Sequence, residues 1–336
     1  MNHRGPILVT LGRLRGLTGV LLLAWAWLSG RAAEPPDPRA VLTNVAQIRQ
    51  LGPAALRNPQ PVRLRGVVTY HDPDWSLLFA QDATGGIYVR VPTAELPLAR
   101  GQLVEISGRT ALDGFTPCVD WLSMRVLEPS APPVARLVSL REFQSGAHDG
   151  RRVELAGVVR AVGQVFNRLL IHIHTGPDDV DVILRDPAPN DPRMAALVGA
   201  RVRVRGVCAT ERKADGQPRE ARLLVPSLDD LMVESPAPAP SYDTPPTTIA
   251  ALRALSSAAE ERLRIRGVIT QAVSNQVMTV RDETGSIDVQ TEGGTPTQAG
   301  DWVEAFGFRG GGPAQPVLEH AVYRVRALKQ DRKSVV

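Results

Sequence analysis

The chain has 336 residues, of which 43% are hydrophobic and 22% charged, and its formal net charge is +4. This hydrophobic fraction supplies core material for two or three globular domains, so the composition excludes an intrinsically disordered chain. The excess positive charge lies in residues 1–32, which hold four arginines and no acidic residue. Residues 33–336 therefore hold 35 basic and 35 acidic side chains, and bulk charge gives no support for nucleic-acid binding.

The first 32 residues have the organisation of a secretory signal peptide. Arginines precede an apolar run from Gly16 to Trp27, and small residues follow at Gly30 and Ala32. This run is shorter than the ~20 residues that a membrane-spanning helix needs. We therefore predict a cleaved signal peptide at 1–32 and a periplasmic or cell-envelope location for the rest of the chain. An uncleaved membrane anchor is the alternative.

Three segments of the chain repeat an ordered set of features. The first feature is an alternating run with an internal glycine: VRLRGVVTY, VELAGVVRA and LRIRGVITQ, at 62–70, 153–161 and 263–271. Alternation interrupted by glycine is typical of the bent first strand of a small barrel. Each run follows a short predicted helix that opens on a hydroxyl residue able to cap it. These helices are expected at 43–51, 139–143 and 248–255.

The second feature is the motif Asp-x-Thr-Gly-x-Ile-x-Val, which occurs at 82–89 and again at 282–289. The motif joins two β-rich segments, so we predict a hairpin turn in which Gly85 and Gly285 are available for positive φ. Residues 168–184 occupy the same place in the middle segment and lack the motif. The middle segment is therefore the divergent one.

The third feature is a pair of glycines seven residues apart with a valine at the fourth position. It occurs as GQLVEISG, GARVRVRG and GDWVEAFG, at 101–108, 199–206 and 300–307. This spacing predicts a strand that is entered and left through tight turns. Proline-rich segments at 128–136 and 234–247 separate the three units. Such segments predict extended spacers that hold independent barrels apart.

Together these features predict an all-β protein made of tandem five-stranded OB-like barrels, each preceded by a short helix. The predicted domains are residues 42–128, residues 137–234, which form the divergent repeat, and residues 247–328.

The ordered motifs also resemble a known family. The series NVAQIRQL, VRLRGVVTY, LFAQDATGGIYV, GQLVEISG and DGFTPCV resembles the exported OB-like repeat sensor region of bacterial membrane-bound two-component (hybrid) histidine kinases. The resemblance covers about residues 42–328 and is strongest in the first repeat. It implies a sensory or scaffolding role outside the cytoplasmic membrane. It implies no catalytic residue in this chain, because the kinase motifs of that family lie in parts that the resemblance does not cover.

The C-terminal residues give a second indication of a longer protein. Residues 331–336 read Asp-Arg-Lys-Ser-Val-Val, which is also the translation of a common sequencing-adapter sequence followed by a stop codon. The chain has three lysines among 39 basic residues, and two of them, Lys329 and Lys333, lie in its last eight positions. We therefore expect 331–336 to be the non-biological tail of a truncated gene, whose missing part would contact the membrane.

Aromatic residues make up only 4% of the chain, and six of them lie in the first repeat. OB barrels bind ligands on the face of strands two and three and through the loops that join strands one to two and four to five. Aromatic side chains there stack on sugar rings, bases or peptide side chains. We therefore predict a ligand surface formed by Tyr70, Trp75, Phe79, Phe115 and Trp121. Filling of a small barrel core is the alternative role for these residues.

Other reactive residues give weaker signals. His172 and His174 lie two apart on a predicted strand near several aspartates and are the candidate metal ligands. Without a defined third ligand we favour exposed strand histidines, so no metal and no cofactor is predicted. Cys118 and Cys208 are the only cysteines and fall in different repeats. We expect two unpaired, partly buried thiols, with a disulfide as the alternative.

These observations predict a non-enzymatic exported ligand-binding or scaffolding module, the N-terminal sensory part of a truncated membrane signalling protein of the histidine kinase type. The alternative is a free secreted OB-fold protein that binds oligosaccharide or nucleic acid. An enzyme ranks third, because no nucleophile, base and orienting group recur together. The expected partner is a small molecule, a glycan or a periplasmic protein, and nucleic acid is less favoured.

Overall fold

The computed structural model describes residues 40–327, except 93–96, 115, 177, 186–191, 213–217, 239–243, 256–260, 275, 292, 294 and 313. The predicted signal peptide at 1–32 and the predicted tail at 331–336 lie outside the described residues. Among the helices that are described, none has the length and apolar character that crossing a membrane requires.

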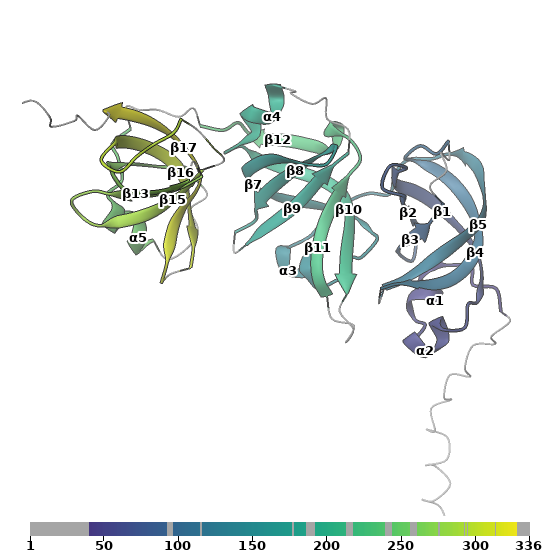
Figure 1. Ribbon diagram of the computed structural model, residues 1–336. Coiled ribbons are helices and arrows are strands. Elements are labelled where there is room, and N and C mark those ends of the chain that lie inside the picture. The colour runs from purple at the N-terminus through teal and green to yellow at the C-terminus, as the bar shows by residue number, and fades with distance from the viewer. Residues whose placement is uncertain are drawn as a thin grey trace, which may run out of the picture. The chain divides into compact units, whose positions relative to one another are not determined.

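The first barrel follows two short helices, α1 (Val45–Arg49) and α2 (Pro53–Leu56). Its strands close in the order β1-β2-β3-β5-β4, with β3 parallel to β5 and the other neighbours antiparallel (Figure 1). The strands are β1 (Pro61–Asp72), β2 (Leu77–Gln81), β3 (Gly86–Arg90), β4 (Gln102–Asp113) and β5 (Thr116–Pro129). A small five-stranded barrel of this kind is an OB fold, as predicted.

The third barrel has the same order of strands and follows helix α5 (Ile249–Ala254). Its strands are β13 (Leu263–Ser274), β14 (Val277–Arg281), β15 (Ser286–Thr291), β16 (Trp302–Gly311) and β17 (Pro316–Ala327). Again the third and fifth strands, β15 and β17, run parallel. The prediction of tandem barrels, each preceded by a short helix, is confirmed.

The middle barrel keeps the same circuit of strands, because β10 pairs with both β7 and β11. It differs in its last strand, which is split by the 3₁₀ helix η1 (Leu228–Asp230) into two pieces that both pair with β10. Its elements are β6 (Arg136–Leu137), α3 (Leu140–Gln144), β7 (Arg152–Val165), β8 (Arg168–His174), β9 (Asp179–Leu184), α4 (Pro192–Leu197), β10 (Arg201–Arg212), β11 (Pro218–Val225) and β12 (Leu231–Ser235). The predicted divergence of this repeat therefore has a structural counterpart.

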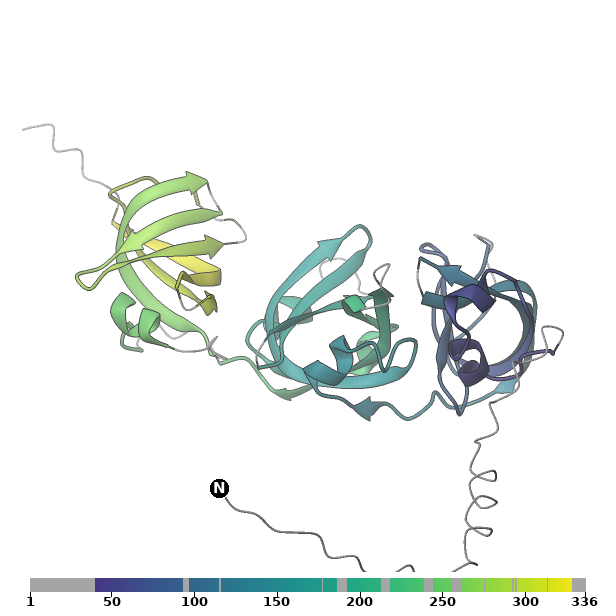
Figure 2. The same ribbon diagram turned by 90° about the horizontal axis from the view of Figure 1, so that it is seen from below.

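Each barrel encloses its own apolar core, and the preceding helix covers one end of it. In the first barrel Val45 and Ile48 of α1 pack with strand residues such as Leu64 and Ile87. Figure 2 shows α1 and α2 across the opening of this barrel. Burial of such an aliphatic side chain contributes about 1.5–3 kcal/mol, so the apolar face of the helix holds it in place.

The predicted helix starts agree with the structure at two of three sites. Ser139 and Thr248 cap α3 and α5 by accepting a hydrogen bond from the third residue of each helix. Helix α1 is capped by Asn44 instead of the hydroxyl residue before it. The side chain of Asn44 accepts from the Gln47 N–H (3.0 Å), and Gln47 Oε1 accepts from Thr43 N–H (2.8 Å). An amide caps as well as a hydroxyl does, which moves the start by one residue.

The paired glycines seven residues apart have two different roles. The first glycines have positive φ: +84° at Gly101, +96° at Gly199 and +100° at Gly300. Each lies one or two residues before its strand, which is β4, β10 or β16. The predicted tight turn at the start of each strand is confirmed. The predicted turn at the second glycine is wrong, because Gly108, Gly206 and Gly307 lie inside these strands.

The second glycine makes room for the last strand of the barrel, which pairs antiparallel with the strand that holds the glycine. A Cβ at Gly206 would lie 2.6 Å from the carbonyl oxygen of Leu224, and one at Gly307 would lie 2.8 Å from that of Glu319. At Gly108 the carbonyl oxygen of Asp120 is closer still. Contacts this short are excluded for a real Cβ, so these positions require glycine because the paired strand comes so close.

The repeated Asp-x-Thr-Gly motif forms a turn that also caps the preceding helix. In the first barrel Asp82 Oδ1 accepts hydrogen bonds from the N–H groups of Thr84 (2.7 Å) and Gly85 (2.8 Å). Its other oxygen accepts from Val45 N–H (2.8 Å), and Thr84 Oγ1 accepts from Ala46 N–H (3.0 Å). The turn thus supplies acceptors for the first N–H groups of α1, which have no partner within the helix.

The third barrel repeats this arrangement bond for bond. Asp282 accepts from Thr284 N–H (2.7 Å), Gly285 N–H (3.0 Å) and Ile249 N–H (2.8 Å), and Thr284 Oγ1 accepts from Ala250 N–H (3.0 Å). The predicted turn is confirmed, but the predicted reason for its glycine is wrong. Neither turn glycine is among the residues with positive φ. A Cβ at Gly85 would lie 3.0 Å from Val45 Cγ1, so the glycine makes room for the helix.

Candidate ligand-binding site

The first two barrels meet through a buried ion pair. Asp72, at the end of β1, is fully buried and accepts hydrogen bonds from Arg168 Nε (2.8 Å) and Nη2 (2.6 Å) at the start of β8. The same Nη2 pairs with Asp74 (2.8 Å). The hydrogen bonds from Arg168 to Asp72 raise the pKa of the guanidinium above its ordinary value. A pair with this geometry is a specific contact. The structure therefore differs from the expectation that the spacer holds these barrels apart.

Apolar side chains continue the contact beside the ion pair. Tyr70 and Phe79 of the first barrel cluster with Ile183, Val207 and Leu224 of the second. Tyr70 is fully buried, and burial raises the pKa of its phenol. The proline-rich segment at 128–136 predicted separated barrels and did not indicate this shared cluster. Tyr70, predicted to face ligand, is instead part of it, because the second barrel covers its ring.

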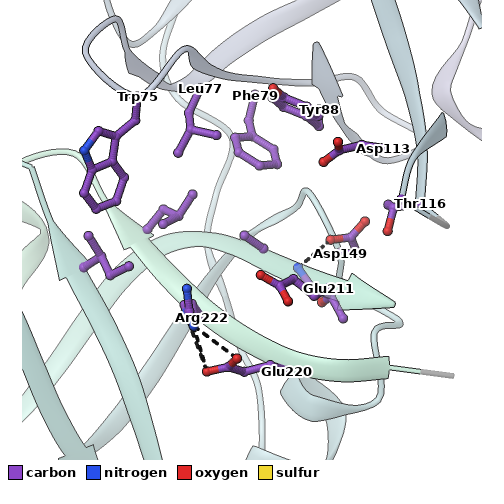
Figure 3. Close-up of a pocket in the computed structure, with 15 residues that line it drawn as sticks. Trp75, Leu77, Phe79, Tyr88, Asp113, Thr116, Asp149, Glu211, Glu220 and Arg222 are labelled. Carbon is purple, nitrogen blue, oxygen red and sulfur yellow. Dashed lines mark hydrogen bonds and ion pairs between the residues drawn. The ribbon is translucent and has the colours of Figure 1, made fainter. Parts of the chain in front are cut away.

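A cavity of about 430 Å³ opens next to this cluster (Figure 3). One wall comes from the first barrel, where β2, β3 and the turn before β2 supply apolar and aromatic side chains, and the region of the β4–β5 turn supplies Asp113 and Thr116. The facing wall comes from β9, β10 and β11 of the second barrel. The main lining residues are Trp75, Leu77, Phe79, Tyr88, Asp113, Thr116, Asp149, Ile183, Glu211, Glu220, Arg222 and Leu224. The first wall is the surface on which OB folds bind ligands.

Aromatic rings form the wall of the first barrel. Phe79 on β2 lies directly opposite Tyr88 on β3, and their ring centroids are 5.5 Å apart. Trp75 lies in the turn before β2 and is held from the second barrel by the edge of Phe166 (6.4 Å between centroids) and by the guanidinium of Arg168 (5.4 Å from the ring centroid). The second barrel therefore fixes the position of Trp75.

Carboxylates dominate the polar part of the cavity. Asp149 accepts from Thr210 N–H (2.9 Å) and pairs with Arg49 (3.0 Å). Glu220 pairs with Arg222 (3.1 Å), whereas Glu211 is exposed and has no hydrogen bond or ion pair among the described residues. Asp113 lies 3.6 Å from its nearest cation, Arg90. Two carboxylates thus face the cavity with little or no neutralisation by the residues that the structure describes.

The predicted site residues fall into three groups. Trp75 and Phe79 line the cavity, as proposed for a ligand surface. Trp121 packs against the core of the first barrel, with its indole Nε1 buried, and Tyr70 lies in the shared cluster. Phe115 lies outside the described residues, although its neighbours Gly114 and Thr116 line the cavity.

Sequence reasoning missed Tyr88 and the whole second wall. Tyr88 stands at a variable position of the Asp-x-Thr-Gly-x-Ile-x-Val motif, and alternation along β3 places it on the face opposite Ile87. That signal was present in the sequence. Glu211 and Arg222 carry no comparable signal, because their part in the cavity depends on contact between two repeats.

The two candidate metal ligands each bond to an aspartate. His172 Nδ1 lies 2.9 Å from Asp181, and His174 Nδ1 lies 2.6 Å from Asp179. Within the described ranges no cluster of three His, Cys, Asp or Glu side chains is arranged to hold a metal ion. His174 is only 4% exposed in its side chain, so the favoured description as an exposed strand histidine is wrong for this residue.

Both cysteines are free, so the expectation of unpaired thiols is confirmed, but both are fully buried where partial burial was expected. Burial raises the pKa of Cys118 and of Cys208 to about 12. Neither sulfur lines the cavity described above. The thiols therefore act as small apolar core groups.

Several solved structures are similar to parts of this chain at low sequence identity. No family model matches the sequence, and no curated protein matches it. Among solved structures, the hypothetical protein ygiW from E. coli is similar over 24% of this chain and 89% of its own, with 20% identity and a TM-score of 0.22. The tetrameric p202 HIN2 covers 52% of this chain and 94% of its own, with 9% identity and a TM-score of 0.25. A murine DNA binding protein bound with double-stranded DNA covers 55% and 99%, with 12% identity and a TM-score of 0.24.

Proposed function

We propose that the chain is a non-enzymatic binding module whose ligand occupies the cavity between the first two barrels. The observation that carries this proposal is the aromatic wall of Trp75, Phe79 and Tyr88 on the β2–β3 face. OB folds bind ligands on this face, and the volume of about 430 Å³ is in the range of small-molecule sites. An aromatic wall with a few polar groups opposite it is the usual composition of such a site.

The charge of the cavity bears on the choice between ligands. Nucleic-acid sites neutralise phosphates with lysine and arginine. Here the polar lining residues include Glu211 of the second barrel and Asp113 of the first. The one cation among the described lining residues, Arg222, is paired with Glu220. We therefore place small molecules and glycans ahead of nucleic acid as ligands.

We further propose that the module is exported and serves as the sensory part of a membrane signalling protein of the histidine kinase type. The support is the resemblance of the repeats to such regions and the composite nature of the cavity. A ligand held between two barrels contacts both, so binding alters how they fit together, and movement of domains about an interface is a common route for signals. The alternative, a free secreted binding protein, has the same site and lacks the membrane-bound continuation.

The binding proposal is tested with a ligand screen and a pair of tryptophan variants. The full chain is screened by thermal shift against amines, oligosaccharides, short peptides and single-stranded oligonucleotides. Trp75→Ala should weaken binding of any hit by at least about 5-fold, since stacking on one ring contributes about 1–3 kcal/mol. Trp121→Ala is the matched control, because its ring packs on the barrel core away from the cavity. Hits that respond to Trp121→Ala and not to Trp75→Ala would refute the assignment of the site.

The sensory proposal needs a genetic test of its own. The locus is amplified and sequenced past codon 330. An open reading frame that continues into a membrane span and signalling domains is the expected result. A genuine stop codon at that point would favour the free secreted protein.

A further inference from the structure

Among the described residues, the net charge of the cavity lining is negative even after the cations that contact it are counted. Four carboxylates and one guanidinium line it: Asp113, Asp149, Glu211, Glu220 and Arg222. Arg49 and Arg90 contact this set from outside, and Arg90 is shared with Asp120. With Asp120 included, the described residues supply five carboxylates. They also supply three guanidinium groups, those of Arg222, Arg49 and Arg90, so the net charge is −2.

Each of these arginines is already engaged by protein acceptors. Arg222 forms hydrogen bonds to both oxygens of Glu220 (3.1 Å each). Arg49 donates to the carbonyl oxygen of Gly86 (2.6 Å) and to Asp149 (3.0 Å). Arg168, at the Trp75 end, is bound by Asp72 and Asp74. Each described cation of this set is thus paired with at least one carboxylate of the protein.

The aromatic wall favours the same sign of ligand charge. Cations are attracted to the faces of tryptophan, tyrosine and phenylalanine rings, most strongly where water is excluded. Figure 3 shows Trp75 and Leu77 toward one end of the cavity, and Asp113, Asp149 and Glu211 toward the other. Ile183 and Leu224 complete the apolar part. The cavity therefore offers an apolar region that continues into a region of negative charge.

We infer that the site takes an organic cation with an apolar body, such as an amine or ammonium group carried on an aromatic or aliphatic group. The ammonium group lies between Glu211 of the second barrel and Asp113 of the first, and the apolar body lies against Trp75, Leu77 and Phe79. This inference rests on the proposed binding function of the cavity and adds the class of ligand. Since the two carboxylates belong to different barrels, the cation bridges them.

The experiment compares three probes of equal shape and different charge. Binding of 2-phenylethylamine, 2-phenylethanol and phenylacetate to the full chain is measured by isothermal titration calorimetry at neutral pH and low salt. The amine should bind about 3- to 10-fold more tightly than the alcohol, because two contacts with exposed carboxylates together contribute a factor of this size. The acetate should bind more weakly than the alcohol.

Two variants assign the charge preference to the named carboxylates. Glu211→Gln and Asp113→Asn should each lower the affinity for the amine several-fold and leave the affinity for the alcohol unchanged. Glu283→Gln is the control, because Glu283 is an exposed acid in the third barrel and its removal changes the total charge equally. A loss of amine affinity in Glu283→Gln equal to that in Glu211→Gln would show a non-specific charge effect and overturn the inference.

The other outcomes separate the class of ligand from the site itself. If the alcohol or the acetate binds as tightly as the amine, and Trp75→Ala abolishes that binding, the cavity is a ligand site and the cationic class is wrong. If none of the three probes binds at millimolar concentration, the cationic class is also wrong. The proposed site fails separately, when no hit of any class depends on Trp75.

Discussion

The first and third barrels are built alike around their helices and differ on the face of their second and third strands. Arg49 donates to the carbonyl oxygen of Gly86 in the first barrel, and Arg253 donates to that of Ser286 in the third. Both helices are capped by an Asp-x-Thr-Gly turn through the same pattern of bonds. The capping turn and the arginine contact, which both barrels share, therefore stabilise the barrel fold itself.

The faces of the two barrels have different chemistry at matching positions. Phe79 pairs across the strands with Tyr88 in the first barrel. In the third barrel Thr279 pairs with Asp288, and the threonine hydroxyl donates to the aspartate (2.7 Å). An aromatic pair has thus been replaced by a polar pair on an unchanged framework. We therefore assign the proposed ligand site to the first barrel and propose none on the matching face of the third.

The largest expected effect concerns the dependence of the first barrel on the second. Arg168→Met removes the guanidinium and leaves the carboxylate of Asp72 buried without its partner, which should cost about 3–5 kcal/mol of unfolding free energy. Urea-dependent hydrogen exchange, which follows each barrel separately, is the measurement. Peptides of the first two barrels should lose protection, and those of the third should not.

The control for this change is Arg222→Met, which breaks a partly exposed pair. It should cost less than about 1 kcal/mol. Equal losses for the two variants would show that the Asp72–Arg168 pair does not join the barrels, and the contrast between the first and third barrels would weaken.

The second expected effect exchanges one residue between the two motifs. A Cβ at Gly86 would overlap the carbonyl oxygen of Gly150 in the second barrel, whereas the third barrel carries Ser286 at this position. Gly86→Ser should therefore lower stability by about 1–3 kcal/mol, as overpacking does. Ser286→Gly should change it much less. Melting temperatures of both variants test this, and a neutral Gly86→Ser would mean that the two barrels do not approach so closely.

A third, smaller effect should be the same in both barrels. Asp82→Ala and Asp282→Ala each remove the acceptor for two turn N–H groups and for the first N–H of a helix. Loss of such a cap costs about 1 kcal/mol. Thermal unfolding of the two variants should give matched losses. A large difference between them would contradict the equivalence of the two turns.

The smallest effect is a pH dependence shared by both barrels. Hydrogen bonds from Arg63 and Arg65 lower the pKa of Glu105 to about 2. At Glu304 burial raises the pKa, but hydrogen bonds from Arg264, Arg324 and Arg326 outweigh it and lower the pKa to about 2 as well. Because the folded pKa is depressed, each carboxylate stabilises the fold above its ordinary pKa of 4.5, and this contribution is lost as pH falls toward 2.

Glutamine variants measure that contribution directly. Glu105→Gln and Glu304→Gln should each melt slightly below the unmodified chain at neutral pH. The difference should shrink between pH 4.5 and pH 2. A constant difference across this range would show that the carboxylates do not titrate as stated. The effect stays small because most of the arginine partners of these two buried carboxylates are partly or largely exposed, so solvent screens the pairs.

The barrels could be predicted because the sequence patterns that specify their strands and turns are local. Alternation sets the strands, and glycine marks the places where backbones turn or cross. The role of Gly85 could not be assigned in this way, because its neighbour is Val45 of a helix forty residues earlier. The repeated Asp-x-Thr-Gly motif identifies a turn from sequence alone. The helix that this turn contacts is known only from the three-dimensional structure.

The candidate site was half predictable for a related reason. Trp75 and Phe79 stand out because aromatic residues are scarce, and OB folds bind on a known face. Asp72 and Arg168 are 96 residues apart, and no periodicity links them. One usable sign was present: the two motifs differ at Gly86 and Ser286, and a glycine found in only one copy indicates close approach of another backbone.

The capping turns also bear on the order in which each barrel folds. Helix α1 has five residues, far below the length of ~12–15 at which an isolated helix becomes marginally stable. The groups that accept from its first two N–H groups lie 37 and 38 positions later in the chain. During synthesis the helix residues emerge first, yet they have no stable conformation until the β2–β3 hairpin has formed. The N-terminal element of each such barrel is therefore expected to be the last to fold.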